Sequence, residues 1–298
     1  MDIQTLNSKY ALAGQLTFTE GKGFFPMAVI ENQFAKCEVS LYGAQVLSYQ
    51  PKGQQDLLWM SDASMFQAGK AIRGGIPICF PWFGPHETDT QKPMHGFARL
   101  LTWNVTETST LVNGATQLKL NLNNKPVTLE MWPFPFEAEV VVVVGDTLEV
   151  TLSYSNSGNK TFVCSDALHT YFNVSDIANV SIAGLTGTKY FVGPDKDKVY
   201  TQTEQLLTIQ KEENRRYIDH TGHCIIEDTG YNRKIRVVKK GSKVTVVWNP
   251  WDGAKNMADM LPDGYKTMIC VEAVNAYNNM VSVNPGQSFS VSTIIGVV

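Results

Sequence analysis

The sequence predicts an all-β protein, a large antiparallel β-sandwich with a few short helices at its edges. Three observations predict it. Apolar and polar residues alternate in many short segments, glycine-containing turns separate pairs of these segments, and no apolar stripe with the helical period runs longer than about three turns. Alternation with a period of two is typical of strands that have one buried face and one solvent-exposed face.

The alternating segments are spread along the whole chain. They are residues 37–41, 118–122, 148–154 and 289–294. Two pairs of segments have the spacing of β-hairpins: 140–144 precedes 148–154 across a Gly-Asp turn, and 235–238 precedes 244–248 across a turn that contains Lys and Gly. We therefore expect each pair to lie side by side in one sheet.

Helical and irregular segments are few. Short helices are expected at residues 62–67 and 256–260, and the polar run 189–216 predicts either a long loop or an irregular pair of strands. No linker or repeat of fixed period divides the chain. Residues 1–298 are therefore expected to form a single domain, although this length alone would allow two.

Composition and charge exclude several functional classes. Hydrophobic residues make up 43% of the 298 residues, which is enough for a large core. The net charge of -3 argues against nucleic acid or an acidic membrane surface as a partner. The longest apolar run, 140–144, is too short to span a bilayer, and residues 1–8 lack the pattern of a signal peptide. We expect a cytoplasmic protein that holds any anionic ligand through local cations.

The five cysteines predict reduced, mostly buried thiols rather than disulfides or a metal centre. Their number is odd, they are widely spaced, and no Cys-x-x-Cys pair occurs. Cys79 and Cys164 are minor candidates for a nucleophile. His220 and His223 have metal-like spacing, but no further ligand completes a set, so no metal is expected.

The most unusual stretch is residues 73–99, which is rich in proline and glycine. Proline removes a backbone donor and glycine permits dihedral angles closed to other residues, so neither a long helix nor a central strand is favoured. Aromatic residues between these breakers favour partial burial. The stretch is either a loop packed on the core, with Arg73 and Arg99 in surface ion pairs, or the wall of a pocket.

His169 and Glu272 each lie among apolar residues. Alternation in the segment 165–174 places His169 mid-strand, where it is either a hydrogen-bonded core residue or a proton-transfer group. An unpaired carboxylate buried in the apolar segment around Glu272 would cost several kcal/mol or have a raised pKa. Glu272 is therefore either in a salt bridge, for instance with Arg73 or Arg99, or a general base.

Four segments together resemble the aldose 1-epimerase superfamily and, within it, the hexose-6-phosphate mutarotase (glucose-6-phosphate 1-epimerase) branch. They are RGGIPICFPWFG at 73–84, HGFAR at 95–99, LHTYFNVSDI at 168–177 and GYKTMICVEA at 264–273. The resemblance implies a galactose mutarotase-like β-supersandwich. It also implies that the protein interconverts the α and β anomers of an aldohexose 6-phosphate without a cofactor.

The resemblance implies that His169 and Glu272 are the catalytic residues. Opening a hemiacetal ring requires a proton delivered to the ring oxygen and another removed from the anomeric hydroxyl. We expect Glu272 to act as the base on the O1 hydroxyl and His169 as the acid toward the ring oxygen. The roles are exchanged when the aldehyde has rotated about C1–C2 and the ring closes again.

The resemblance also implies a set of substrate-binding residues, namely Arg73, His95, Arg99 and Asn214. The arginines are expected to hold the phosphate, since guanidinium groups pair with phosphate oxygens through two hydrogen bonds. Asn214 stands where members usually have an aspartate that contacts sugar hydroxyls, and Met94 stands where a polar residue is expected. Both departures bear on the choice of sugar.

Two other functions remain open at this point. The protein could be a mutarotase of unphosphorylated aldoses, or a non-catalytic carbohydrate-binding protein with Trp82, Trp248 and Trp251 as a stacking platform. An acid–base pair separates these alternatives from catalysis, because binding alone does not need one. The expected partner is a small sugar phosphate, and a monomer is expected.

Overall fold

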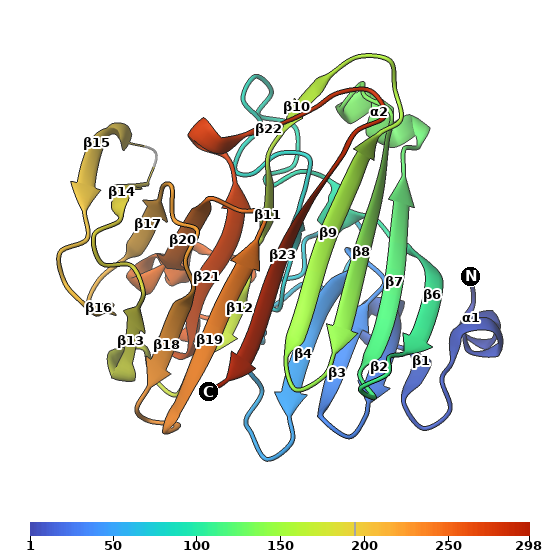
Figure 1. The fold of residues 1–298 in the computed structure, drawn as a ribbon, viewed down its shortest axis with the longest axis horizontal. Coiled ribbons are helices and arrows are strands. Elements are labelled where there is room, and N and C mark those ends of the chain that lie inside the picture. Colours follow the sequence, from blue (N-terminus) through green and yellow to red (C-terminus); the bar gives the residue numbers. More distant parts are fainter. Residues whose placement is uncertain (194) are drawn as a thin grey trace.

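A nine-stranded antiparallel sheet forms the front face of the computed structural model, which describes residues 1–193 and 195–298 (Figure 1). Its strands, in spatial order, are β16 (Leu207–Thr208), β13 (Val180–Ala183), β18 (Cys224–Asp228), β19 (Arg233–Lys240), β23 (Ser288–Val297), β9 (Leu148–Asn156), β8 (Phe136–Val144), β7 (Thr116–Asn123) and β6 (Asn104–Thr110). Every second residue of β7, β8 and β9 is buried, as the alternation predicts.

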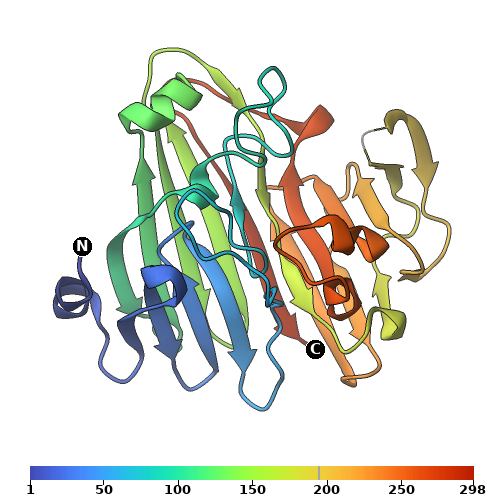
Figure 2. The same ribbon diagram turned by 180° about the vertical axis from the view of Figure 1, so that it is seen from behind.

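Two further sheets lie side by side behind this one (Figure 2). The four-stranded sheet has the order β1 (Leu16–Glu20), β2 (Pro26–Glu31), β3 (Ala35–Ser40) and β4 (Gln45–Pro51). The eight-stranded sheet has the order β15 (Asp195–Thr201), β14 (Lys189–Val192), β17 (Glu213–Tyr217), β20 (Val244–Asn249), β21 (Met268–Asn275), β11 (Asp166–Leu168) and β5 (Ile78–Cys79), with β12 (Tyr171–Asn173) also paired to β21. A separate pair joins β10 (Phe162–Cys164) to β22 (Val281–Val283).

The main core lies between the front sheet and the two rear sheets. One cluster of buried side chains includes Val39 from β3, Leu152 from β9 and Val271 from β21, one residue from each sheet. Burial of a side chain of this kind contributes about 1.5–3 kcal/mol. The predicted all-β sandwich is thereby confirmed, and hydrophobic burial holds its layers face to face.

One of the two predicted hairpins is wrong. β8 and β9 pair as expected, but β19 pairs with β18 and β23, whereas β20 pairs with β17 and β21. The turn at residues 241–243 therefore carries the chain from the front sheet to the rear sheet. Alternating burial suits β19, which has one wet face, while most of β20 is buried on both faces because loops cover the outside of the rear sheet.

Helices are short and lie outside the sandwich. The α-helices are α1 (Ile3–Tyr10) and α2 (Pro126–Met131), and the 3-10 helices are η1 (Lys22–Phe24), η2 (Ala98–Leu100), η3 (Ile177–Asn179), η4 (Trp251–Asn256), η5 (Gly264–Thr267) and η6 (Tyr277–Asn279). The helices predicted at 62–67 and 256–260 are wrong. The segment 62–67 is a loop, and 256–260 is a loop after Asn256, the last residue of η4. Ser61 and Ser64 hold the first segment through hydrogen bonds to the backbone of Asp259 and Arg73.

The polar run 189–216 contains strands rather than one long loop. β14 pairs with β15 and with β17, so this run extends the eight-stranded sheet to its edge. Pro194 lies outside the described residues. Within the described part of the chain, no helix has both the length and the apolar composition needed to cross a bilayer.

Candidate active site

The candidate site lies on the outer face of the eight-stranded sheet. In β21, Val271 packs into the main core, whereas the side chains of Cys270 and Val274 belong to two smaller clusters on the opposite face. Glu272 lies between these two residues and shares their face, since side chains alternate along a strand. Loops and the helices η4 and η5 cover this face (Figure 2).

His169 lies in a break between two short strands, and not mid-strand as predicted. β11 and β12 both pair with β21 and are separated by His169 and Thr170. The stretch that begins at Arg73 fills the break, because the amides of His169 and Tyr171 donate to Pro77 and Gly75 at 3.1 and 2.9 Å. The predicted alternation still holds, so His169 and Tyr171 both face the site.

The break brings His169 to Glu272. The Nε2 atom of His169 lies 3.4 Å from Oε1 of Glu272, and the two residues are only 7% and 2% exposed. Neither Arg73 nor Arg99 forms an ion pair with Glu272 among the described residues. The salt bridge considered from the sequence is therefore absent there, and the histidine is the partner of the carboxyl group.

Burial sets the protonation of this pair. It lowers the pKa of His169 to about 3, with a further decrease from the charges of Arg73 and Arg99. Burial also raises the pKa of Glu272 well above its usual value, and the charge of Arg216 offsets part of that increase. The favoured form has a protonated Glu272 facing a neutral imidazole. Nδ1 of His169 and Oε2 of Glu272 are buried without a hydrogen-bond partner.

Aromatic rings surround the imidazole. The ring of Tyr171 stacks on His169 with centroids 4.8 Å apart, and Trp248 meets His169 edge-on at 6.0 Å. The other two tryptophans considered as a platform pack elsewhere, Trp82 against Phe97 and Trp251 against Tyr265. Trp248 is thus the tryptophan of that set whose ring contacts the site.

Arg73 is already paired with an acidic residue. Its Nε and Nη2 atoms donate to the two carboxylate oxygens of Asp259, both at 3.1 Å, and Nη1 donates to the hydroxyl of Tyr171 at 2.9 Å. This two-point geometry fixes the plane of the guanidinium. Asp259 therefore balances the positive charge of Arg73 within the protein itself.

His95 lies beside His169 and carries a neutral donor. Its Nδ1 accepts a hydrogen bond from the amide of Gly84 at 3.1 Å, so the ring proton is on Nε2. The two imidazole rings meet edge-on with centroids 5.5 Å apart. Burial, and then the charge of Arg99, lowers the pKa of His95 well below its usual value. His95 is therefore uncharged at neutral pH.

Arg99 carries a charge that no acidic residue balances within 4 Å in the described part of the chain. Its Nη2 donates to the carbonyl of Met94 at 2.7 Å, and its Nε is buried without a partner. The side chain of Met94 is 55% exposed. At this position, where the sequence departs from the expected polar residue, it is the backbone that holds the arginine.

Two glycines hold the stretch 73–99 in place, Gly75 against β4 and Gly96 against an earlier part of the stretch itself. A Cβ atom on Gly75 would lie 2.1 Å from the carbonyl oxygen of Val46, and one on Gly96 would lie 2.1 Å from that of Phe80. Both glycines also have positive φ angles, 61° and 74°. Because the backbone is this close to its neighbours, the stretch forms a fixed wall of the site.

β17 contributes residues from alternate positions. The strand register places Asn214 opposite Trp248 and Arg216 opposite Val246, so both face the site. Arg215, between them, points away and donates to Glu213 at 3.0 Å and to the side chain of Gln202 at 2.7 Å.

The sequence reasoning missed three residues of the site: Tyr171, Arg216 and Asp259. Tyr171 and Arg216 could have been predicted from the sequence, because each lies two residues from a predicted site residue and residues two apart in a strand share a face. Asp259 lies in a loop, and no periodic pattern connects it to Arg73.

The set His169, Cys270 and Glu272 has the composition of a metal site, with its ligand atoms within 4.8 Å of one another. Burial raises the pKa of the Cys270 thiol well above its usual value, which disfavours the thiolate that a metal would need. The charges of Arg73 and Arg99 act on the same histidine. This environment suits proton transfer and an anionic ligand better than a cation.

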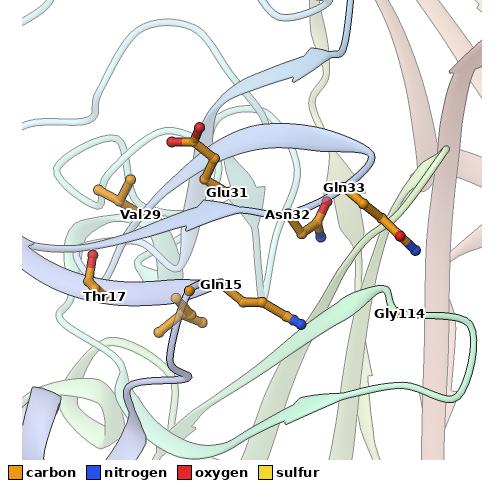
Figure 3. A pocket seen from close by; sticks show the side chains of 9 residues that line it. Gln15, Thr17, Val29, Glu31, Asn32, Gln33 and Gly114 are labelled. Carbon is orange, nitrogen blue, oxygen red and sulfur yellow. The ribbon is translucent and has the colours of Figure 1, made fainter.

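A separate open cleft of about 620 Å³ lies by β1 and β2 and shares no residue with this site (Figure 3). Figure 3 shows Gln15, Asn32 and Gln33 pointing toward the turn that holds Gly114. These amides are used within the chain: Gln15 accepts from the hydroxyl of Thr116 at 2.9 Å, and Asn32 donates to the carbonyl of Val144 at 2.9 Å. These two side chains therefore connect the edge of the four-stranded sheet to the nine-stranded sheet beside the cleft.

Comparison with known proteins identifies the family. The family model described as aldose 1-epimerase matches residues 26–296. This chain belongs to the aldose 1-epimerase family. The expected family is thereby confirmed, and its match extends over nearly the whole chain.

Individual members of the aldose 1-epimerase family are close to this chain. A relative from Salmonella typhimurium strain LT2 is 37% identical over 84% of this chain and 83% of its own length, and one from Escherichia coli strain K12 is 36% identical over the same shares. Both carry the provisional name glucose-6-phosphate 1-epimerase. A crystal structure from Salmonella typhimurium, provisionally described as a mutarotase, has a TM-score of 0.89 at 32% identity and covers 97% of this chain and 95% of that one.

Proposed function

We propose that the protein is a hexose-6-phosphate mutarotase, which interconverts the α and β anomers of glucose 6-phosphate or a similar aldohexose 6-phosphate. The observation that carries the proposal is the buried pair of His169 and Glu272, 3.4 Å apart on the outer face of the rear sheet. The names of the relatives support the choice of a sugar phosphate. The unbalanced charge of Arg99 supports an anionic substrate.

The proposed mechanism uses one proton shared by the pair. When Glu272 is ionised and His169 is protonated, Glu272 takes the proton of the O1 hydroxyl while His169 gives its proton to the ring oxygen. The bond between C1 and the ring oxygen breaks, and C1 becomes an aldehyde. The pair is left as a protonated carboxyl and a neutral imidazole, which is the form that burial favours.

Ring closure reverses these transfers. Rotation about C1–C2 turns the other face of the aldehyde toward the C5 hydroxyl, which is the nucleophile. His169 then takes the proton of that hydroxyl while Glu272 protonates the aldehyde oxygen. The product is the opposite anomer, and the pair returns to its starting charges. No electrons are transferred and no group leaves, so the two side chains supply all the chemistry.

The surrounding residues are proposed to orient the sugar. The ring of Trp248, which is partly exposed, offers a flat apolar surface for the C–H face of a pyranose. His95, whose ring lies edge-on to that of His169, has a neutral Nε2–H donor. Asn214, opposite Trp248, donates and accepts hydrogen bonds without charge. Substrate oxygens would also satisfy the unpartnered Nδ1 of His169 and Oε2 of Glu272.

The test is the rate of anomer exchange, measured by NMR exchange spectroscopy with and without protein. Exchange of glucose 6-phosphate well above the spontaneous rate, and faster than that of glucose, would support the proposal. Equal acceleration of both sugars would indicate a mutarotase of unphosphorylated aldoses. Binding without acceleration would indicate the carbohydrate-binding alternative.

A further inference from the structure

Arg216 lies in the same cross-strand row as Glu272. The register pairs Arg216 of β17 with Val246 of β20, and Val246 with Glu272 of β21. Directly opposite residues of antiparallel strands point to the same face, so the guanidinium lies over the surface that carries the acid–base pair. Phe191 of β14 continues the row on the other side of Arg216.

Aromatic rings, and not a carboxylate, hold the Arg216 side chain. Its central carbon lies 5.1 Å from the ring centroid of Tyr277 and 5.6 Å from that of Phe191. Tyr277 also accepts a hydrogen bond from the guanidinium. The Nε atom of Arg216 is buried without a partner, and no acidic residue lies within 4 Å of its nitrogens in the described part of the chain. Ring contacts orient a cation but do not neutralise it.

The two ends of the site therefore differ in charge. At one end, Tyr171 pairs with Cys270, and Arg73 is balanced by Asp259. At the other end lies Tyr277, beyond the end of β21, whose ring contacts both Phe83 and the unbalanced Arg216.

His95 connects the second end to Arg99. Its ring packs against Phe83 with centroids 4.8 Å apart. Burial lowers the pKa of His95 most, followed by the charge of Arg99, with smaller effects of Arg73 and Arg216. Ring contacts from Tyr277 through Phe83 therefore connect the unbalanced Arg216 to the same imidazole that Arg99 acts on.

We propose that Arg216 and Arg99 together hold the phosphate group of the substrate beside His95, and that Arg73 serves the sugar end of the site. This inference rests on the proposed function, and it places the phosphate group of that substrate at the end of the site that holds Tyr277. Two guanidinium groups match the charge of a phosphate dianion and supply paired donors to its oxygens. The neutral Nε2–H of His95 is a further donor at this end of the site.

The first test compares two substrates in one variant. Arg216→Met removes the charge and keeps most of the length, and Arg236→Met is the matched control, because Arg236 is exposed on β19. We expect Arg216→Met to raise KM for glucose 6-phosphate by about ten- to a hundredfold, the usual range for hydrogen bonds to charged groups. KM for glucose should change much less than KM for glucose 6-phosphate, and Arg216→Lys should restore part of the affinity for glucose 6-phosphate.

The opposite pattern would overturn the inference. If Arg216 acted only through Glu272, kcat would fall equally for both sugars and the pH profile of kcat would move. Unchanged constants for glucose 6-phosphate in Arg216→Met would exclude a phosphate contact.

A binding measurement separates this inference from the proposed function. Inorganic phosphate titrated by calorimetry should bind wild-type protein and Arg236→Met equally, and Arg216→Met at least about tenfold more weakly. A failure of wild-type protein to accelerate anomer exchange would refute the mutarotase function, whereas this loss of phosphate binding would still support the anion site. Phosphate that binds Arg216→Met as tightly as wild type, or that does not bind wild type, would overturn the anion site.

Discussion

The Nε2 atom of His169 lies 3.4 Å from Oε1 of Glu272, although the two residues are far apart in the sequence. The contact forms because β11 and β12 flank His169 and both pair with β21, the strand that carries Glu272. Both side chains are buried, so the sheet fixes their separation and their protonation together.

Removing either member of this pair should stop catalysis without unfolding the protein. We expect His169→Gln and Glu272→Gln each to reduce kcat by about 10²–10⁴, the usual contribution of a proton-transfer group. The double variant should be little worse than either single one, because the two groups act as a unit. His223→Ala, at an exposed position, is the control. Near-wild-type exchange in either single variant would refute the mechanism.

The pH dependence of kcat should follow the shared proton. Burial lowers the pKa of His169 to about 3 and raises that of Glu272 well above its usual value. The form with one proton on the pair is active, so activity should persist well below pH 6 and fall on the alkaline side when that proton is lost. The measurement is kcat at saturating substrate, corrected for spontaneous exchange at each pH. An acid limb near 6.5, the ordinary value for histidine, would contradict this protonation.

Arg73 and Asp259 should depend on each other for stability. Removing one partner leaves the other half-buried and unpaired, so Arg73→Met and Asp259→Ala should each destabilise the fold by about 1–3 kcal/mol. The double variant should lose less than the sum, with a coupling of about 0.5–3 kcal/mol in urea unfolding. The exposed pair of Lys266 and Asp263 is the control, and its coupling should be below about 0.5 kcal/mol. Additive losses for Arg73 and Asp259 would show that they do not interact.

Asp166 should make the fold less stable as the pH rises. Its carboxyl accepts from the hydroxyl of Tyr154 at 2.7 Å and from the amide of Asn275 at 3.1 Å, and burial raises its pKa to about 7. Between the unfolded value of 3.8 and about 7, the folded protein holds a proton that the unfolded chain has lost, so the free energy of unfolding decreases with pH.

Asp166→Asn should remove this contribution. The free energy of unfolding of wild type, relative to that of the variant, should therefore fall from pH 4 to pH 7 and then level off, with about 1.4 kcal/mol for each pKa unit. Urea unfolding at several pH values measures the difference. A difference that does not change with pH would mean that Asp166 is ionised in the folded state.

The sequence predicts faces better than it predicts neighbours. Alternation placed His169 and Tyr171 on one face correctly, even though a break interrupts the strand. The same alternation suggested a hairpin between the segments now seen as β19 and β20, which lie in different sheets. The alternation of apolar and polar residues shows which face of a strand is buried. Which strands pair depends on contacts between distant segments, and no local pattern contains that information.

The same contrast between local patterns and tertiary contacts applies to the residues of the site. His169, Glu272 and Arg73 are found from local patterns and from the resemblance, but the partner of Arg73 is Asp259, in a loop that was expected to be helical. An arginine in isolation gives no indication of whether its charge is already balanced. That property depends on tertiary contacts, and here it distinguishes Arg73 from Arg99.

The alternation along β17 also has an evolutionary consequence. Asn214 and Arg216 face the ligand side, while Arg215 is tied to Glu213 and Gln202 on the other face. Under the proposed function, mutations at the first two positions would change which sugar is accepted while the packing that Arg215 serves stays intact. Selection for a new substrate and selection for a stable fold would therefore act on neighbouring codons of this strand almost independently.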